Sequence, residues 1–312
     1  NKMAKGKIRT VLGDIDAKDL GFTMSHEHIL TKPQGGGEKD EFDHVLDSLP
    51  KAIQMLNEYK AIGGNSIIEA TPQTWGRNTP GMYIASKETG VNVVACTGWM
   101  NADSGHTERE NLMTIDDMYE EMVHDVTVGM DGTSIKAGWI KCGTSYMHIT
   151  PSEEKVIRAG ARAAMETGAV LHSHTTTGTM GLEIIEILEE EGFDLSRMIL
   201  AHVDRFPDLW YHRQLLKKGV TLIYDGPHKA KYYPDQLRVD LLKQLVLDGY
   251  EDQLMLSNDM GRRSHHTVYG GGPGFNWIKQ RFLPRLLDEG LSQEVIDKFM
   301  IHNPARLYQM IK

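Results

Sequence analysis

The stretch Gly21-Phe22-Thr23-Met24-Ser25-His26-Glu27-His28 decides how the rest of the chain is interpreted. Phe22 to Ser25 has the pattern of a short strand that ends in a His-x-His pair. Side chains two residues apart in a strand point to the same face, so His26 and His28 can bind one ion while Glu27 faces the other way. Histidine is the commonest metal ligand in proteins. The pair indicates either a metal site completed by residues elsewhere or two ordinary polar residues at a strand end.

The composition argues against several classes of protein. Of the 312 residues, 40% are hydrophobic and 25% are charged, which is typical of a globular protein. The formal net charge of −9 argues against general binding to nucleic acid or to acidic membranes. No stretch approaches the roughly 20 apolar residues of a membrane span, and Asn1 to Thr10 lacks the apolar core of a secretory signal. Because the two cysteines, Cys96 and Cys142, imply no disulfide framework, we expect a cytoplasmic protein.

Short apolar, strand-like runs alternate with helical patterns along the whole chain. A Gly-rich polar loop, Thr31 to Asp43, follows the first strand. Further strands are predicted at 65–70, 91–97, 135–141, 169–174, 198–202, 220–225 and 254–258, with helical patterns between them. Eight strand–helix units in about 300 residues is the count of a (β/α)₈ barrel, or TIM barrel. Because no linker separates a second unit, we expect one barrel domain over residues 1–312.

Polar side chains stand at the predicted carboxyl ends of five of these strands. They are His26, His28, Lys141, His174, His202 and Asp259. In a barrel these strand ends converge on one face, which is where barrel active sites lie. A single catalytic zinc ion needs only about three protein ligands, so six positions suit two ions.

Lys141 is the unusual member of this set, because a free ammonium group cannot bind a cation. Its amine can form a Schiff base with a carbonyl substrate, as in an aldolase. Alternatively, CO₂ can carboxylate the amine to give an anionic carbamate that bridges two metal ions. The neighbouring histidines favour the carbamate, and together with Asp259 it would place two negative charges beside two divalent ions.

The motifs around these residues resemble those of the phosphotriesterase family in the amidohydrolase superfamily, over essentially the whole chain. Residues 21–28 resemble the N-terminal signature of that family. The remaining motifs follow in order: Gly76-Arg77-Asn78, Ile140-Lys141, Ser173-His174, Ala201-His202 and Ser257-Asn258-Asp259. The resemblance implies a metal-dependent hydrolase that acts as a homodimer.

The resemblance also implies a role for each metal ligand. His26, His28 and Asp259 would hold the more buried ion, and His174 and His202 the more exposed one, with carboxylated Lys141 and a hydroxide bridging the two. Zn²⁺ is the expected ion, and Mn²⁺ and Co²⁺ are alternatives. The bridging hydroxide would attack the substrate, while Asp259 would accept the attacking proton and pass it to the leaving oxygen.

The loops after the seventh and eighth strands indicate the kind of substrate. They are basic in an otherwise acidic chain and contain Lys229, Lys231, Arg262, Arg263 and Tyr269. Barrels often bind phosphate with these two loops, and arginine offers a bidentate fork for it. We therefore expect an anionic small-molecule substrate bound by these side chains. The alternative is a solvated cluster of surface charge.

Two further features favour a polar lactone over an apolar one. Met100 stands where many family members carry an aromatic residue, and the loop after the eighth strand is short and polar. The chain in this respect resembles the phospho-furanose lactonases of the family, so we expect a phosphorylated sugar lactone. A phosphotriesterase, an acyl-homoserine lactone hydrolase and, more remotely, a non-catalytic metal-binding barrel are the alternatives.

The remaining histidines carry simpler expectations. His172, two residues before His174, is expected in the core, with contact to a metal ligand as the alternative. The histidines on predicted helices and loops are expected at the surface: His44, His106, His124, His148, His212 and His302.

Overall fold

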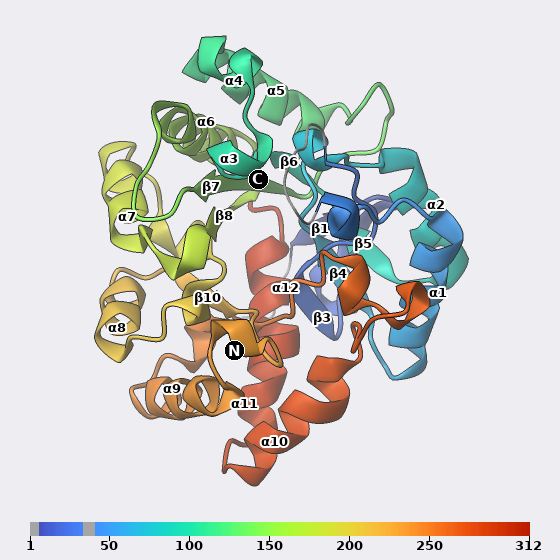
Figure 1. Ribbon diagram of the computed structural model, residues 1–312. Coiled ribbons are helices and arrows are strands. Elements are labelled where there is room, and N and C mark those ends of the chain that lie inside the picture. Colours follow the sequence, from blue (N-terminus) through green and yellow to red (C-terminus); the bar gives the residue numbers. More distant parts are fainter. Residues whose placement is uncertain (1–5, 34–40) are drawn as a thin grey trace.

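The computed structural model describes residues 6–33 and 41–312 (Figure 1). Most of the predicted Gly-rich loop, residues 34–40, lies outside the described residues, as does the start of the chain. The first element is an antiparallel hairpin of β1 (Lys7–Thr10) and β2 (Gly13–Asp16), which the sequence analysis did not predict. The backbone N–H of Val11 donates to Val93 O, which joins this hairpin to the barrel.

Eight parallel strand positions follow, which confirms the predicted barrel. They are β3 (Thr23–Glu27), β4 (Ser66–Glu69), β5 (Asn92–Val94) with β6 (Cys96–Gly98), β7 (Trp139–Thr144), β8 (Val170–Thr175), β9 (Met198–Leu200), β10 (Thr221–Tyr224) and β11 (Leu254–Leu256). β5 and β6 are two parts of the predicted third strand, which is interrupted at Ala95. Next to β11, the Ser257 hydroxyl accepts a hydrogen bond from His26 N at 3.0 Å, and Asp259 N donates to His26 O at 3.2 Å. These bonds connect the last strand position to the first.

Helices surround the strands on the outside (Figure 1). The longer ones are α1 (Leu49–Ala61), α2 (Thr79–Thr89), α5 (Ile115–Thr127), α6 (Pro151–Thr167), α7 (Gly181–Glu190), α8 (Leu209–Lys217) and α9 (Asp235–Leu247). The shorter ones are α3 (Ala102–Gly105), α4 (Glu108–Leu112), α10 (Leu283–Asp288), α11 (Gln293–Asp297) and α12 (Asn303–Tyr308). α6 begins as predicted, because the Thr150 side chain accepts from Glu153 N and Pro151 is the first helical residue. No helix in the described ranges is long and apolar enough to cross a membrane.

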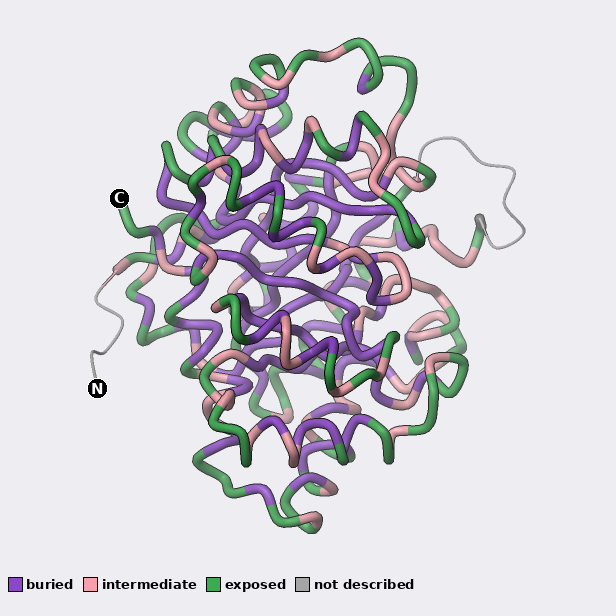
Figure 2. The backbone as a smooth tube through the Cα atoms, turned by 90° about the vertical axis from the view of Figure 1, so that its left-hand side faces the viewer, coloured by how far each residue is buried: buried purple, intermediate pink, exposed green. Residues whose placement is uncertain are grey.

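The core has two layers. One lies between the strands and the helices, and the other fills the inside of the barrel. In the inner layer, Trp139 and Ile199 pack with Ile8 of the hairpin and with Leu307 and Tyr308 of α12, so the hairpin and α12 close the end of the barrel opposite the carboxyl ends of the strands. Figure 2 shows the buried segments running through the middle of the molecule, with exposed segments around them.

Both cysteines belong to this core. Cys96 lies on β6 and Cys142 on β7, and both are fully buried as free thiols. Burial raises the pKa of each thiol to about 12.

Candidate active site

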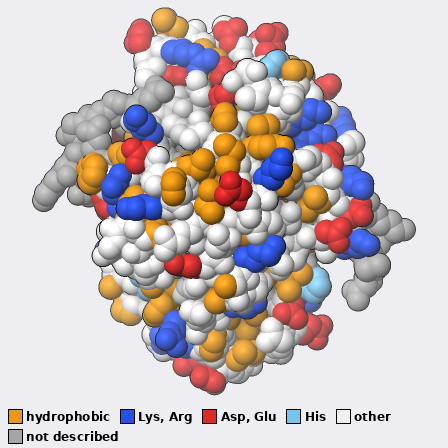
Figure 3. All heavy atoms as spheres, turned by 90° about the vertical axis from the view of Figure 1, so that its right-hand side faces the viewer, with side chains coloured by type: hydrophobic (Ala, Val, Ile, Leu, Met, Phe, Trp, Pro, Cys, Tyr) orange, Lys and Arg blue, Asp and Glu red, His pale blue; other side chains and the backbone are white. Residues whose placement is uncertain are grey.

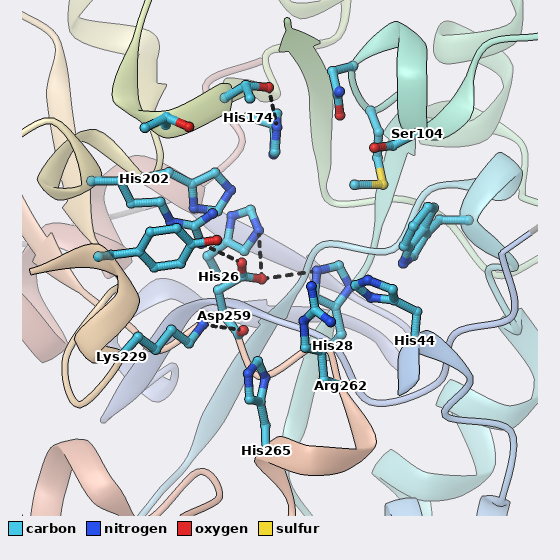
Figure 4. A pocket seen from close by; sticks show the side chains of 18 of the residues that line it. His26, His28, His44, Ser104, His174, His202, Lys229, Asp259, Arg262 and His265 are labelled. Carbon is cyan, nitrogen blue, oxygen red and sulfur yellow. Dashed lines mark hydrogen bonds and ion pairs between the residues drawn. The ribbon is translucent and has the colours of Figure 1, made fainter. Parts of the chain in front are cut away.

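A cavity of about 280 Å³ opens at the carboxyl ends of the barrel strands. All six predicted metal-ligating side chains line it: His26, His28, Lys141, His174, His202 and Asp259. Figure 4 shows the four histidines and Asp259 pointing toward one another. The fold thus brings together residues that are up to 233 positions apart in the chain, as expected for barrel strand ends.

His26, His28 and Asp259 form the tightest part of this cluster. Asp259 Oδ1 lies 3.3 Å from Nε2 of His28 and 3.6 Å from Nε2 of His26. The potential ligand atoms of all three residues lie within 4.8 Å of one another. Nδ1 of His28 is 2.7 Å from the hydroxyl of Thr71, which turns its Nε2 toward Asp259. Burial lowers the pKa of His26 well below its ordinary value, so this imidazole is neutral, which is the form that binds metals.

His174 and His202 lie beside this group. The ring of His202 is centred 4.7 Å from that of His26 and 4.8 Å from that of His174. Nδ1 of His202 is 2.6 Å from Asp225 Oδ2, and Nε2 of His174 is 3.1 Å from the hydroxyl of Thr176. Each ring therefore has one nitrogen fixed by a neighbour and one left for another partner, which is the arrangement of a metal-binding histidine.

Lys141 lies on β7 and is fully buried among these groups. Its Nζ donates a hydrogen bond to Ala70 O at 2.6 Å. Burial lowers the pKa of the amine. A lower pKa increases the share of neutral amine, and the neutral amine is the form that reacts with CO₂, so this environment fits a carboxylated lysine.

Glu27 has a role that the sequence analysis did not predict. It points away from the cavity as expected, and its carboxylate accepts hydrogen bonds from the Ser257 hydroxyl at 2.8 Å and from the N–H groups of Asn258 and Met260 at 2.7 Å each. Burial raises the pKa of Glu27 to about 8. Asp259, between these donors, has a positive φ of 45°, which is strained for a non-glycine residue. Glu27 thus fixes the strained turn that presents Asp259 to the cavity.

Arg205 is a second residue of the cavity that sequence reasoning missed, because it lies in a short 3₁₀ turn, Val203–Arg205, with no recognisable motif. Its Nη2 donates to Asp259 Oδ2 at 2.8 Å and to Asp225 Oδ1 at 3.3 Å. Burial alone would raise the pKa of Asp259. The positive charge of Lys229 and the hydrogen bond from His28 nevertheless hold that pKa well below its ordinary value. Asp259 is therefore ionised.

Three of the five predicted substrate-binding residues line the cavity: Lys229, Lys231 and Arg262. Lys229 is buried, its Nζ donates to Asp259 O at 2.7 Å, and burial lowers its pKa to about 8. Arg262 forms an ion pair with Asp43 at 3.5 Å.

Arg263 and Tyr269 do not line the cavity, contrary to the expectation that they contact substrate. Arg263 Nε donates to Val45 O at 2.6 Å, and its Nη2 lies 3.1 Å from Asp47. The Tyr269 ring packs under the Arg263 guanidinium at 4.8 Å, and its hydroxyl accepts from Ser48 N. The two side chains are turned toward segment 41–48, which they hold against the loop after β11.

Two histidines expected at the surface lie elsewhere. His44 lines the cavity and packs against Trp75, with ring centres 5.4 Å apart. His212 is fully buried, and its Nε2 donates to Val203 O at 2.9 Å and Phe206 O at 2.8 Å. Helix α8 turns this residue inward, which its sequence neighbours did not indicate. His106 is half-buried, whereas the prediction is confirmed for His124, His148 and His302, which are exposed.

The barrel and its cluster of histidines and a carboxylate define a metal-dependent hydrolase. The model of the phosphotriesterase family matches residues 6–308, and the chain belongs to that family. It is similar to the solved structure of a lactonase from Listeria monocytogenes, with a TM-score of 0.94 and 38% identity over 98% of this chain and 100% of the other. It is 35% identical to a phospho-furanose lactonase of Mycoplasmopsis agalactiae, covering 98% of this chain and 92% of the other. It is 33% identical to an N-acetyltaurine hydrolase of Danio rerio, covering 97% of each.

Proposed function

We propose that this protein hydrolyses a phosphorylated furanose lactone at a binuclear metal centre. The observation that carries the proposal is that three of the four lysines and arginines predicted to bind substrate share one cavity with six potential metal ligands. Lys229, Lys231 and Arg262 provide positive charge there in a chain whose net charge is −9. The name of the Mycoplasmopsis agalactiae relative supports the same substrate class.

The donor set fits two divalent ions. His26, His28 and Asp259 would hold one ion, His174 and His202 the other, and carboxylated Lys141 would lie between them. Zn²⁺ suits these imidazole and carboxylate ligands, as do Mn²⁺ and Co²⁺. When bound, such ions lower the pKa of a coordinated water and polarise the carbonyl oxygen of the substrate.

Asp259 is the proposed proton carrier. Its carboxylate is ionised, so it can accept the proton of the attacking water and return it to the ring oxygen that leaves the acyl carbon. Arg205 holds Oδ2, which leaves Oδ1 on the side of His26 and His28. Arg205 thereby fixes the direction in which Asp259 presents its proton.

The cations would bind the phosphate on one side of the cavity. In Figure 4, Lys229, His265 and Arg262 lie on one side of Asp259, and His174 and Ser104 lie on the opposite side. A lactone carbonyl above the central histidines would leave its 5-phosphate on the Lys229 and Arg262 side. Arginine binds phosphate oxygens through two parallel hydrogen bonds, and lysine acts as a point charge.

A matched pair of five-membered sugar lactones, with and without a 5-phosphate, tests the proposal. We expect kcat/KM of the metal-loaded enzyme to be larger for the phosphorylated lactone by roughly 100-fold or more, because charged hydrogen bonds each contribute about 1.5–3 kcal/mol. Equal and low rates would contradict the phosphate site and direct the search to apolar lactones and phosphotriesters.

Hydrolysis of an N-acyl aminosulfonate is the second candidate function. A sulfonate is a tetrahedral oxyanion that the same three cations can bind, and one similar protein is an N-acetyltaurine hydrolase. Its amide leaving group must be protonated, a role open to Asp259. Inclusion of N-acetyltaurine in the same assay separates the two candidates, because its turnover above that of the phosphorylated lactone would favour the amide.

We also propose that the protein acts as a homodimer. Hydrophobic side chains gather among charged ones on the face that includes α1 and α2 (Figure 3), which supports an interface there. Light scattering coupled to gel filtration gives the mass directly, and a monomer of 35.1 kDa would contradict the dimer.

A further inference from the structure

Three buried side chains, His26, His172 and Tyr308, form a row that connects the closed end of the barrel to the candidate metal centre. Nδ1 of His26 lies 3.0 Å from Nε2 of His172, and Nδ1 of His172 lies 3.0 Å from the hydroxyl of Tyr308. The Tyr308 hydroxyl in turn donates to Ser25 O at 3.4 Å. At most 1% of each side chain is exposed. Tyr308 is the last residue of α12, which lies near the centre of the ring of helices (Figure 1).

Only one placement of protons satisfies every member of this row. His26 directs Nε2 toward Asp259, so a metal bound there leaves the ring proton on Nδ1, which donates to His172 Nε2. Because His172 Nε2 accepts this hydrogen bond, the proton of the His172 ring is on Nδ1. That proton is donated to Tyr308, whose own proton is donated to Ser25 O. The row therefore fixes the tautomer of His26.

The packing around the row holds it in one place. The His172 ring stacks on Trp139 with centres 4.4 Å apart and an angle of 22°. Arg197 fixes the end of α12, because its guanidinium donates to Leu307 O at 2.8 Å and to Gln309 O at 3.1 Å. The Tyr308 hydroxyl therefore depends on the docking of α12.

We propose that His172 and Tyr308 are positioning residues for the metal centre, and that docking of α12 and metal binding stabilise each other. The inference rests on the proposed role of His26 as a metal ligand. A partner that accepts the second ring proton of a ligating histidine orients the ring and raises its basicity, and losing such a partner typically weakens metal binding by about 10–100-fold. Coupling between two binding events is reciprocal, so metal binding must also stabilise the docked helix.

The test is a Zn²⁺ titration of the apoprotein, with bicarbonate present, against a chromophoric chelator. We expect His172→Leu to weaken Zn²⁺ binding by about 10–100-fold and Tyr308→Phe to weaken it less. His172→Gln should recover most of the affinity, because its amide oxygen can replace Nε2 as the acceptor. Tyr59→Phe is the matched control. Tyr59 is equally buried and its hydroxyl donates to Phe22 O at 3.1 Å and Ser66 O at 3.0 Å, with no contact to His172 or Tyr308 among the described residues, so this change should lower stability and leave Zn²⁺ affinity unchanged.

Hydrogen exchange provides the reciprocal measurement. Zn²⁺ should slow exchange of the α12 amides in the wild-type protein and slow it less in Tyr308→Phe. Wild-type affinity in both His172→Leu and Tyr308→Phe would overturn the inference. If His172→Leu does not fold, Tyr308→Phe decides alone. A wild-type protein that fails to bind Zn²⁺ tightly would instead overturn the metal assignment itself.

Discussion

Asp259 contacts four other residues that line the cavity. His26 and His28 face its Oδ1, Arg205 holds its Oδ2 and Lys229 holds its backbone carbonyl. These contacts hold the side chain in one orientation. The strained φ of Asp259 is maintained by hydrogen bonds from the neighbouring N–H groups of Asn258 and Met260 to the Glu27 carboxylate. A carboxylate fixed in this way is preorganised for proton transfer.

The substitution Asp259→Asn tests the proton-carrier role. An amide cannot accept the proton of the attacking water, so we expect kcat to fall by about 10²–10⁴-fold, the usual contribution of general acid–base catalysis. Metal content by elemental analysis is the control, because Asp259 is also a proposed ligand. Near-normal turnover with intact metals would remove Asp259 from this role.

The proposed preference for a phosphorylated substrate should depend on pH through Lys229. Burial lowers its pKa to about 8, so the amine is charged below that pH and neutral above it. We expect kcat/KM for the phosphorylated lactone to fall relative to the unphosphorylated one as pH rises through about 8. A ratio that stays constant from pH 7 to about 9.5 would mean that the Lys229 charge does not contribute, and Lys229→Met should abolish the pH dependence of the ratio.

The sequence predicted side chains at strand ends better than side chains in loops. All six proposed ligands reach the cavity. His26, Lys141 and His174 lie in strands, whose alternation fixes the direction of each side chain, and the other three lie within three residues of a strand end. Arg205, His44 and His265 also line the cavity, and each lies in a short 3₁₀ turn that no sequence pattern predicted. Whether the six side chains bind metal stays a prediction.

At the scale of elements, the side chains of the two loops after β10 and β11 divide into those that line the cavity and those that contact segment 41–48. Lys229, Lys231 and Arg262 face the cavity, whereas Arg263 and Tyr269 hold segment 41–48. Arg262 and Arg263 are neighbours in the sequence with opposite directions, because a short helical turn begins between them. Sequence composition predicted the charge of the loop, but it did not predict this division.

Substitution of Arg262 and of Arg263 tests whether the first binds substrate and the second only holds segment 41–48. Arg262→Ala should lower kcat/KM by about 10–100-fold for the phosphorylated lactone and change the unphosphorylated one little. Arg263→Ala should affect both lactones to a similar extent, because it loosens segment 41–48, which carries His44. A selective loss in Arg263→Ala would return that residue to the phosphate site.

Strand and helix types were predicted more accurately than their ends. The fourth strand was predicted to begin at 135 and begins at Trp139, because residues 135–138 continue the loop that follows α5. The hairpin β1–β2 was missed, since its sequence is polar and its burial comes from contact with the barrel and with the chain near Gln309. Such long-range contacts leave no local pattern.

At the scale of the whole molecule, the proposed ligands link five separate strand positions of the barrel. Two ions held by β3, β7, β8 and the segments after β9 and β11 would together connect distant parts of the chain. The barrel fold was predicted from the count of strand–helix units alone, and the similarity to the solved lactonase structure confirms that fold. That residues 1–312 form one domain stays a prediction.

Removal of metal should therefore lower global stability. A ligand present at a thousandfold its Kd stabilises the folded state by about 4 kcal/mol. We expect a chelator to lower Tm by several degrees and re-addition of Zn²⁺ to restore it, measured by scanning calorimetry. The His26→Ala variant should start at the lower Tm and respond to neither treatment, and a chelator-insensitive wild-type Tm would contradict the linkage.

Burial of Cys96 and Cys142 has a practical consequence for labelling. Neither sulfur is exposed, and a thiol pKa of about 12 leaves almost no thiolate at neutral pH, so the native enzyme offers maleimides no reactive group. A cysteine introduced at Phe42, which is 70% exposed beside the cavity loop, would be the sole site of attachment for a fluorophore. The two buried thiols thus leave the molecule ready for single-site spectroscopy.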